Sequence, residues 1–457
     1  MEHQLPHSFL SSLEKNSDFD MDAFVEAHEK YIPVTSVRFN PQKKTNHTIA
    51  LNIAEQIPWS SAGFYLTERP SFTIDPLIHA GAYYVQEASS MFLEEVLNQT
   101  VDLNVSLKVL DLCAAPGGKS TLIQSLISRN SLLVSNEVIK TRVNILSENI
   151  TKWGASNVVV TNNDPSDFKK LPGYFDLIVV DAPCSGSGLF RKDPDAIDHW
   201  SIDNVNLCSQ RQQRILADII DSLKPGGTLI YSTCSYSIEE DEQISNWLIK
   251  TADFISLKIN TDPHWNIVES KIGNSYGYRF YPDKIKGEGF FISAFRKSGE
   301  FSSVKNEFSK IKNKKSNLQL LKSSAFTKWI IENNEMAFLQ WKDDVIVVPE
   351  SIQYELPVLQ SVLYIKKAGV NIGSMIREEL IPSHELAMST LICNSVSSIE
   401  VDLETALNYL RHESMNKFFS QSGWLLLKYG GLPLGFIKAM SNRINNYYPR
   451  EWRILNK

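Results

Sequence analysis

Two cysteines, Cys184 and Cys234, are the residues of this chain best suited to do chemistry. Cys184 ends the run VVDAPC at 179–184, and Cys234 lies in YSTCS at 231–235, after a second apolar run. Short apolar runs rich in branched residues are typical of buried parallel strands. The carboxyl ends of parallel strands meet at one edge of the sheet, where ligands bind in open α/β folds. We therefore expect both thiols at the same edge, in a chain that has only five cysteines.

A pair of thiols at that edge suits the methylation of a pyrimidine ring. Carbon 5 of a pyrimidine is a poor nucleophile, but addition of a thiolate to carbon 6 gives an enamine whose carbon 5 attacks a methyl sulfonium. The thiolate must be favoured by its surroundings, and an acid beside ring nitrogen 3 stabilises the adduct. Asp181, three residues before Cys184, is placed for that task. The alternative, a cysteine that is only a small buried hydrophobe, fits Cys208 and Cys393 better than this pair.

The segment VLDLCAAPGGKST at 109–121 is the strongest local signal. A strand that ends in an acid, a loop of small residues and an apolar helix place backbone N–H groups around a ligand. A phosphate-binding P-loop needs glycine where Cys113 stands, and the loop has no Gly-x-Gly-x-x-Gly dinucleotide fingerprint. Two adjacent glycines, Gly117 and Gly118, instead suit close approach of the amino-acid part of S-adenosylmethionine. A purely structural strand-to-helix turn is the alternative.

Acidic residues close the strands that follow this loop. Glu137 comes after the second strand and is placed to accept hydrogen bonds from ribose hydroxyls, as acids do in related nucleotide folds. Asp164 closes the third strand, where it could hold an adenine amino group, and Asp181 closes the fourth. One acid at a strand end often caps only a turn or a helix, but three after a glycine loop favour a cofactor site. Arg142, one turn into the helix after Glu137, is interpreted as an exposed helix arginine.

The alternation of apolar runs predicts an α/β fold, with a parallel sheet covered by helices, from residue 107 onward. Helices fit at 140–152 and 208–223, and a hairpin-like region at 277–296 would complete the sheet. The strands are expected at 108–112, 132–136, 157–161, 175–180 and 228–232.

Smaller regions flank this sheet. Before it, 18–30 fits a helix with an acidic first turn, and 36–41 fits a short strand that ends in a turn. The pattern in the last part of the chain predicts a small, mostly β appendage. Its strand candidates are 344–348, 362–366, 424–429 and 434–439.

A basic stretch separates the sheet from the appendage. Between Lys305 and Lys322 six lysines face a single acid, Glu307, which indicates a basic linker, with a solvated face as the alternative. The predicted division of the chain is 1–100, 101–297 for the catalytic domain, 298–324 for the linker and 325–457.

The composition excludes several classes of protein. The 457 residues suit two or three domains, no apolar run approaches the roughly 20 residues that span a bilayer, and the first residues lack the features of a signal peptide. Five cysteines without framework spacing fit a reducing, cytoplasmic setting. A net charge of −6 argues against non-specific coating of nucleic acid but allows local RNA-binding patches.

Several segments resemble the RNA (cytosine-5)-methyltransferases of the Sun/nucleolar-protein (NSUN-like) family. The most specific are 111–121, 180–195 and 226–242. RFNP at 38–41, GAYYVQEASS at 81–90 and the segment 278–291 are also similar to that family, so the resemblance covers residues 30–297. It implies a Rossmann-like methyltransferase dependent on S-adenosylmethionine.

The resemblance also implies roles for single residues. Cys234 would be the nucleophile and Cys184 the helper that promotes release of methylated RNA. Position alone favours Cys184, because it follows a proline as the nucleophile of DNA cytosine methyltransferases does. Asp181 would serve both the cofactor and the target base, and no metal is implied. The implied cofactor-binding residues are Cys113, Ala114, Ala115, Pro116, Gly117, Gly118, Lys119, Glu137, Asp164 and Asp181.

The C-terminal part, 423–453, resembles the PUA-like RNA-binding appendage of bacterial small-subunit rRNA methyltransferases of the RsmF type, through Gly430-Gly431 and NNYYP at 445–449. This implies structured 16S rRNA as the substrate and an RNA-binding role for the N-terminal module. Alternatives are cytosine-5 methylation of tRNA, methylation of an exocyclic nitrogen, and an inactive RNA-binding ribosome assembly factor. Nitrogen methylation is disfavoured because DAPC at 181–184 replaces the expected acid or amide followed by Pro-Pro and an aromatic.

Overall fold

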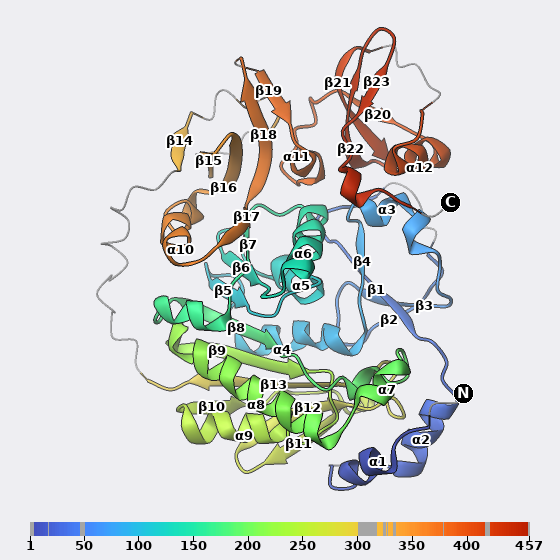
Figure 1. The fold of residues 1–457 in the computed structure, drawn as a ribbon, viewed down its shortest axis with the longest axis vertical. Coiled ribbons are helices and arrows are strands. Elements are labelled where there is room, and N and C mark those ends of the chain that lie inside the picture. Colours follow the sequence, from blue (N-terminus) through green and yellow to red (C-terminus); the bar gives the residue numbers. More distant parts are fainter. Residues whose placement is uncertain are drawn as a thin grey trace.

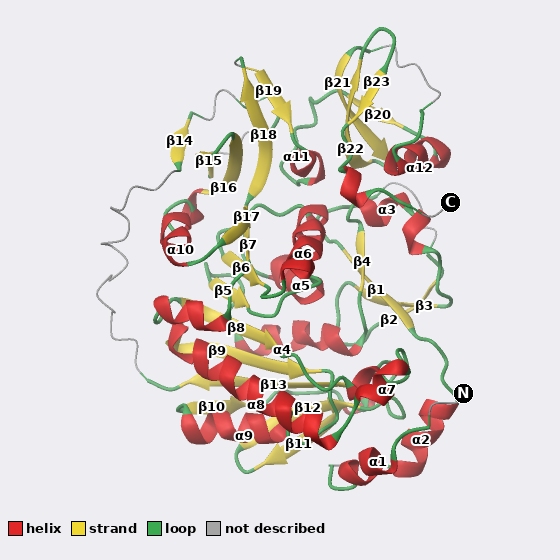
Figure 2. Ribbon diagram, viewed as in Figure 1, coloured by secondary structure: helices red, strands yellow, loops and turns green. Residues whose placement is uncertain are grey.

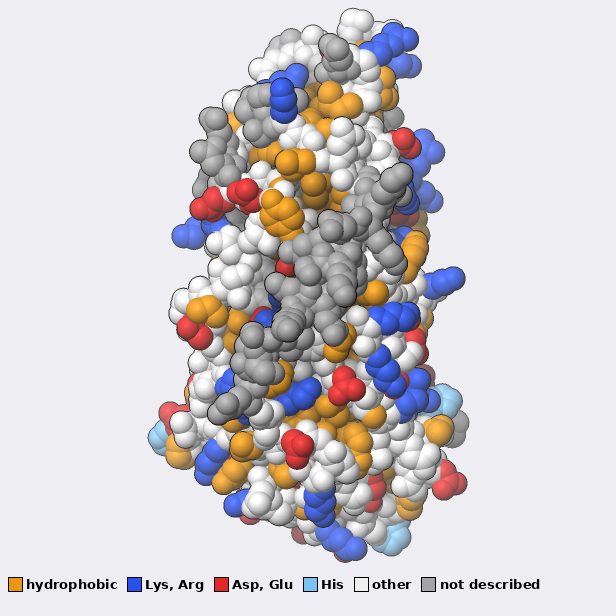
Figure 3. Space-filling view, turned by 90° about the vertical axis from the view of Figure 1, so that its left-hand side faces the viewer, with side chains coloured by type: hydrophobic (Ala, Val, Ile, Leu, Met, Phe, Trp, Pro, Cys, Tyr) orange, Lys and Arg blue, Asp and Glu red, His pale blue; other side chains and the backbone are white. Residues whose placement is uncertain are grey.

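The computed structural model describes residues 4–16, 18–45, 51–299, 318–322, 326, 328–331, 335–377, 379–415 and 421–455. Within these residues the chain forms four sheets along an elongated molecule (Figure 1). The proposed linker, 298–324, lies mostly outside the described residues. On the face drawn in Figure 3, Lys and Arg side chains are interspersed with acidic and apolar ones.

The largest sheet has ten strands and holds the parallel core that the sequence predicts. Its order is β11-β12-β13-β9-β8-β5-β6-β7-β17, with β10 paired to β13, and β9, β8, β5, β6 and β7 run parallel. The strands are β5 (Lys108–Asp111), β6 (Leu132–Asn136), β7 (Val158–Thr161), β8 (Phe175–Asp181), β9 (Leu223–Thr233), β10 (Phe254–Leu257), β11 (Val268–Ile272), β12 (Ser275–Phe280), β13 (Phe290–Lys297) and β17 (Ile365–Ala368).

Helices cover both faces of this sheet (Figure 2). Neighbouring strand residues point to opposite faces, so Val109 packs with α5 and α6 while Leu110 packs with α8 and α9. Each helix turns a buried apolar stripe toward the strands, and the alternating core explains why the sequence pattern predicts this part well. The helices are α4 (Leu93–Thr100), α5 (Gly118–Leu126), α6 (Lys140–Trp153), α7 (Asp195–His199), α8 (Ile202–Ile219) and α9 (Glu242–Thr251).

One helix boundary differs from the sequence prediction. The helix expected at 208–223 begins earlier, at Ile202, because the Ser201 hydroxyl accepts a hydrogen bond from the Asn204 N–H and caps it. It ends at Ile219, and strand β9 already includes Leu223.

Among the described residues, the N-terminal module consists of three α-helices and an antiparallel sheet of order β2-β3-β1-β4. Arg38 of β1 fastens it to the catalytic domain: its Nη2 donates to Thr121 Oγ1 at 2.6 Å, and its guanidinium lies over the Trp153 ring. The elements are α1 (His7–Leu13), α2 (Met21–Glu29), β1 (Thr35–Phe39), β2 (Ile53–Gln56), β3 (Gly63–Leu66), α3 (Pro76–His79) and β4 (Tyr83–Val85).

The C-terminal region forms two further sheets, of order β14-β15-β16-β18-β19 and β20-β21-β22-β23. Its elements are β14 (Gln319–Leu321), β15 (Met336–Trp341), β16 (Asp344–Pro349), α10 (Leu356–Val362), β18 (Val370–Ile376), β19 (Glu379–Pro382), α11 (His384–Met388), β20 (Ser398–Glu400), α12 (Leu403–Arg411), β21 (Gly423–Tyr429), β22 (Leu432–Ala439) and β23 (Ile444–Asn446).

Two features of this region were not expected from the sequence. The strand candidate at 362–366 is confirmed only in part, because Val362 ends helix α10 and the strand β17 begins at Ile365. This strand pairs with β7 and extends the catalytic sheet instead of the C-terminal appendage. The last sheet shares a hydrophobic core with the N-terminal module, in which Val37 and Tyr83 pack with Leu425 and Tyr448. Among the described residues, no helix combines the length and apolar character needed to cross a membrane.

Candidate active site

The two cysteines meet at the carboxyl ends of adjacent parallel strands. Asp181, the last residue of β8, pairs with Ser232 of β9, so the segments that follow both strands leave the sheet side by side. Cys184 Sγ and Cys234 Sγ lie 3.1 Å apart as free thiols. The chain departs from β5 to β6 and β7 on one side and to β8 and β9 on the other, and ligands bind in the crevice at such a switch point.

The surroundings keep the proton on Cys184. A hydrogen bond with Cys234, together with burial, raises the pKa of the Cys184 thiol well above its ordinary value. A protonated Cys184 can donate a hydrogen bond to the sulfur of Cys234. Either sulfur can be the donor in this contact, so the distance by itself does not separate the roles of the two thiols.

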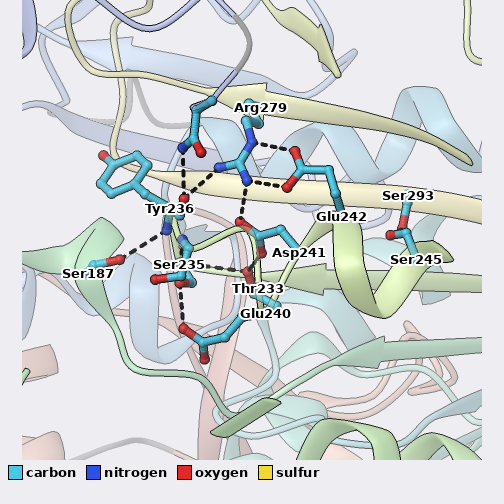
Figure 4. A network of polar contacts seen from close by, with 12 residues as sticks. Ser187, Thr233, Ser235, Tyr236, Glu240, Asp241, Glu242, Ser245, Arg279 and Ser293 are labelled. Atoms are coloured by element: carbon cyan, nitrogen blue, oxygen red, sulfur yellow. Dashed lines mark hydrogen bonds and ion pairs between the residues drawn. The ribbon is translucent and has the colours of Figure 1, made fainter. Parts of the chain in front are cut away.

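Glu240 joins the segments that follow Cys184 and Cys234 through its carboxylate, and Figure 4 shows its contact with Ser235. Its carboxylate accepts from the Ser185 N–H at 2.8 Å and from the Ser185 hydroxyl at 2.5 Å. On the other side it accepts from the Ser235 hydroxyl at 2.7 Å, and Gln212 Nε2 donates to it at 3.1 Å. Glu240 is fully buried, and this burial raises the pKa of its carboxyl group. Sequence reasoning missed it; the acidic run 239–242, which follows Cys234, was the available signal.

Gly188 allows the segment after Cys184 to approach the nucleophile candidate closely. Its N–H donates to the carbonyl oxygen of Cys234 at 2.8 Å, and its own carbonyl accepts from the Gly289 N–H at 3.1 Å. A β-carbon at this position would lie 2.6 Å from the carbonyl oxygens of both Cys234 and Gly289. Only glycine fits without moving one of the two segments.

The glycine loop lies next to these strand ends, between β5 and α5. Gly117 has φ +120°, a backbone conformation that favours glycine, and Gly118 begins α5. Asn149 Nδ2 donates to the carbonyl of Pro116 at 2.8 Å and fixes the loop to α6. Lys119 reaches across the crevice to Asp181, with Nζ 2.8 Å from Oδ2.

Three acidic side chains, Asp111, Asp181 and Glu137, gather in this crevice. Asp111, the buried last residue of β5, accepts from the Ser120 hydroxyl at 2.6 Å, but its other carboxylate oxygen has no hydrogen-bond partner. Burial raises the pKa of Asp111 to about 7, and the nearby Asp181 and Glu137 add to the shift. A cationic ligand is favoured here, and S-adenosylmethionine carries a sulfonium and an ammonium group, so the residues present fit it.

Glu137 and Arg142 line the crevice on the side of β6 and α6. The Glu137 carboxylate accepts from the Ile139 N–H at 2.9 Å and lies 3.6 Å from Arg142 Nη1. Arg142 Nη2 donates to the carbonyl of Ala115 at 2.6 Å. Arg142 is an exposed helix arginine, as interpreted, with its side chain 48% exposed. Its guanidinium in addition joins the glycine loop to Glu137.

Asp164 has a capping contact in addition to any role toward a ligand. Its Oδ1 accepts from the Ser166 N–H at 3.0 Å and from the Ser166 hydroxyl at 2.7 Å, and its Oδ2 lies 3.8 Å from Arg214 Nη1. Its place in a cofactor site therefore stays a prediction.

The other cysteines differ in their surroundings. Cys113, in the glycine loop, has its pKa raised by burial, so it stays a neutral thiol. Cys208 is buried on α8, whereas Cys393 is only half-buried, with Sγ 3.0 Å from Ser395 Oγ. Across the described part of the chain, no cluster of three or more His, Cys, Asp or Glu side chains could hold a metal ion.

Three family models match the chain. Residues 98–296 match the 16S rRNA methyltransferase RsmB/F family, 5–88 match the N-terminal domain of 16S rRNA methyltransferase RsmF, and 396–454 match the RsmF PUA domain. Two relatives are ribosomal RNA small subunit methyltransferase F of Aliivibrio fischeri (strain MJ11), 30% identical, and of Shewanella loihica, 29% identical. The alignments cover 98% of this chain and 97% and 95% of those proteins.

Solved structures agree in fold. A methyltransferase homolog protein from Pyrococcus horikoshii is 29% identical with a TM-score of 0.51, and covers 64% of this chain and 100% of its own. NSun6 from Pyrococcus horikoshii with SFG is 18% identical, has a TM-score of 0.54, and covers 65% and 100%.

The fold, the glycine loop and the acidic crevice define an S-adenosylmethionine-dependent methyltransferase. Its N-terminal module and C-terminal PUA domain accompany a Sun-type catalytic domain, which confirms the fold class expected from the sequence. The chain belongs to the RsmF family of 16S rRNA methyltransferases.

Proposed function

We propose that this enzyme methylates carbon 5 of a cytosine in 16S rRNA through a covalent adduct with Cys234. The observation that carries the proposal is the pair of free thiols, 3.1 Å apart, at the crevice that also holds the glycine loop. A methyltransferase that acts on an exocyclic nitrogen needs no thiol. Two thiols at the strand ends, of which one is kept protonated, support nucleophilic catalysis.

Cys234 begins the reaction. Its thiolate adds to carbon 6 of the cytosine, and the electron pair of the 5,6 double bond makes carbon 5 nucleophilic. S-adenosylmethionine, when bound, supplies the electrophilic methyl group. The proton on carbon 5 then leaves for a base or water, the carbon–sulfur bond breaks, and its electron pair returns to Cys234. The 5,6 double bond is restored in the methylated ring.

Cys184 assists the last step. The thiol that stays protonated beside Cys234 can donate a hydrogen bond to the departing sulfur, which stabilises the thiolate as a leaving group. Without that donor the adduct should persist. The roles that the family resemblance implies are therefore chemically consistent with the asymmetry of the pair.

Asp181 and Lys119 are proposed to hold the target ring. Asp181 accepts from the Ser232 hydroxyl at 2.8 Å and forms an ion pair with Lys119, so a carboxylate and an ammonium group face the crevice together. They can hydrogen-bond the nitrogen 3 edge of the cytosine and stabilise the charge of the adduct. The base must leave its stack to reach them, as enzymes acting on bases generally require.

The cofactor site is proposed to follow the sequence prediction. Residues 113–119 would cradle the amino-acid part, Glu137 the ribose and Asp164 the adenine, while Asp111 adds a buried negative charge. The N-terminal module and the PUA domain would bind the rRNA, in the cytoplasm. Phosphate contacts make such binding weaken with salt.

Bisulfite sequencing of 16S rRNA and tRNA tests the function, with RNA from cells that have or lack this protein. The proposal predicts that a 16S rRNA cytosine loses its methyl group when the protein is absent. Unchanged 16S rRNA together with lost methylation in tRNA would contradict it.

A further inference from the structure

The chain between the methyltransferase and PUA matches contributes to the catalytic sheet. Residues 297–395 lie between the segments that match the methyltransferase and PUA models, yet β17 lies within them and pairs with β7 through Ile365 with Thr161 and Ala368 with Val159. Strand β7 ends directly before Asn162, Asn163 and Asp164. The segment therefore reaches the loop that is proposed to hold the adenine.

Tyr364, just before β17, forms hydrogen bonds to this loop through its main chain. Asn163 Nδ2 donates to the Tyr364 carbonyl at 3.1 Å, and the Tyr364 N–H donates to Asn163 Oδ1 at 2.9 Å. The same carbonyl accepts from the Asn162 N–H at 3.1 Å. The Tyr364 residue is 65% exposed, so its main chain makes the contact and its side chain is largely free in solvent.

Further hydrogen bonds extend from this contact to the rest of the crevice. Asn136 Oδ1 accepts from the Asn163 N–H at 3.0 Å, and Asn136 Nδ2 donates to the carbonyls of Asn163 and Leu112 at 3.0 and 3.1 Å. Asn162 Nδ2 donates to the carbonyl of Glu137 at 2.6 Å. A shift of Asn163 would therefore also change the positions of Glu137 and of the start of the glycine loop.

Helix α10, which leads into Tyr364, is itself fixed to the catalytic domain. Glu355, at its N-terminus, accepts from Tyr174 OH at 2.6 Å and pairs with Lys108 Nζ at 2.9 Å. Leu356 and Leu359 are buried in the core that includes strands β5 to β9. The residue that contacts Asn163 therefore follows a helix that is itself anchored to the catalytic domain.

We propose that residues 335–372 are a structural part of the cofactor site, and that Asn163 is the positioning residue through which they act. The clamp between Asn163 and Tyr364 holds the 162–164 loop in the conformation that presents Glu137 and Asp164 to the adenosine part of S-adenosylmethionine. This inference rests on the proposed assignment of those two acids to the cofactor.

Calorimetric titration of the full-length protein with S-adenosylmethionine tests the clamp. Asn163→Ala removes two hydrogen bonds to Tyr364 and leaves the main-chain bonds to Asn136, so the binding-competent loop becomes a minor state and the Kd should rise about tenfold. Asn163→Asp, which keeps the volume but faces the Tyr364 carbonyl with an oxygen, should weaken binding at least as much. Asn130→Ala is the control and should leave the Kd unchanged, because Asn130 is exposed before the start of β6 and makes its hydrogen bonds through its main chain.

Kinetics separate positioning from general damage. Asn163→Ala should raise the KM for S-adenosylmethionine about tenfold while the KM for RNA and the kcat at saturating cofactor stay unchanged. Wild-type affinity in both Asn163 variants would overturn the clamp and leave the proposed function intact. Equal weakening by Asn130→Ala would also overturn it, since the loss would then not depend on the contact between Asn163 and Tyr364. If the unsubstituted protein bound no S-adenosylmethionine, the proposed function and the clamp would fail together.

Discussion

At the scale of single residues, the two thiols have different surroundings although their sulfurs are 3.1 Å apart. The hydrogen bond to Cys234, together with burial, raises the pKa of the Cys184 thiol well above its ordinary value. The residue order around Pro183 favours Cys184 as the nucleophile, whereas this raised pKa is consistent with the proposed donor role. Local sequence predicts that both thiols are reactive, but their division of labour depends on a contact between residues 50 positions apart.

Glu240 should be needed to keep both cysteine segments in place. Glu240→Ala leaves the donors of Ser185, Ser235 and Gln212 without their acceptor, so the free energy of unfolding should fall by about 3 kcal/mol. Single-turnover methylation should slow, while the Kd for S-adenosylmethionine stays unchanged. Urea denaturation and calorimetry measure these quantities. Glu239→Ala is the control and should cost less than about 1 kcal/mol; equal losses in the two variants would contradict the role of Glu240.

At the scale of elements, the predicted strands of the parallel sheet all form, because alternating apolar runs encode them locally. Partners distant in the chain are not encoded in this way. The candidate at 362–366 overlaps strand β17, yet its partner β7 lies about 200 residues earlier, and no local pattern points to it. The same reason explains why the contacts of Asn163 and Arg142 could not be predicted from the sequence: they are made with other elements.

The junction between β12 and α9 should depend on one buried arginine. Arg279 pairs with Glu242 and lies 3.1 Å from Asp241, whose other oxygen accepts from Thr233 directly before Cys234 (Figure 4). Arg279→Met would leave two buried carboxylates without their cationic partner. In a urea titration, the free energy of unfolding should therefore fall by about 3–5 kcal/mol.

The control for this junction is an exposed ion pair. Lys170 lies 2.8 Å from Asp167 with its side chain 56% exposed, so Lys170→Met should cost under about 1 kcal/mol in the same urea titration. Similar losses in Arg279→Met and Lys170→Met would show that burial does not set the strength of the Arg279 network.

At the scale of the whole molecule, the N-terminal module and the PUA domain lie against each other although they occupy opposite ends of the chain. Both present apolar faces whose partner the sequence does not identify, because hydrophobic periodicity marks a buried face without saying what buries it. The sheet and helix α3 of the N-terminal module therefore share one core with the PUA domain, and α3 lies next to α12 in Figure 1. Helices α1 and α2 instead pack against the catalytic domain at the opposite end of the molecule (Figure 1).

His79 should make this contact sensitive to acid. Its Nε2 lies 2.9 Å from the Thr73 carbonyl oxygen and its Nδ1 3.5 Å from Tyr448 OH, and burial lowers the pKa of His79 to about 4. A lowered histidine pKa stabilises the fold fully above pH 6.5, and this contribution is lost as the pH falls toward 4.

Denaturant titrations at two pH values measure the effect. Between pH 7.5 and 5 the wild type should lose about 2 kcal/mol more free energy of unfolding than His79→Gln, which cannot take up a proton. The same loss in both proteins would rule out His79 as the source.

The most direct test of the account is the trapping of the adduct. Purified wild-type protein, Cys184→Ala and Cys234→Ser are incubated with 16S rRNA and S-adenosylmethionine and separated on a denaturing gel. Cys184→Ala should accumulate a slowly migrating protein–RNA species that survives denaturation, because the departing Cys234 thiolate has lost its hydrogen-bond donor. Cys234→Ser should form neither adduct nor product while still binding S-adenosylmethionine. An adduct in Cys234→Ser and none in Cys184→Ala would reverse the two roles and contradict the mechanism.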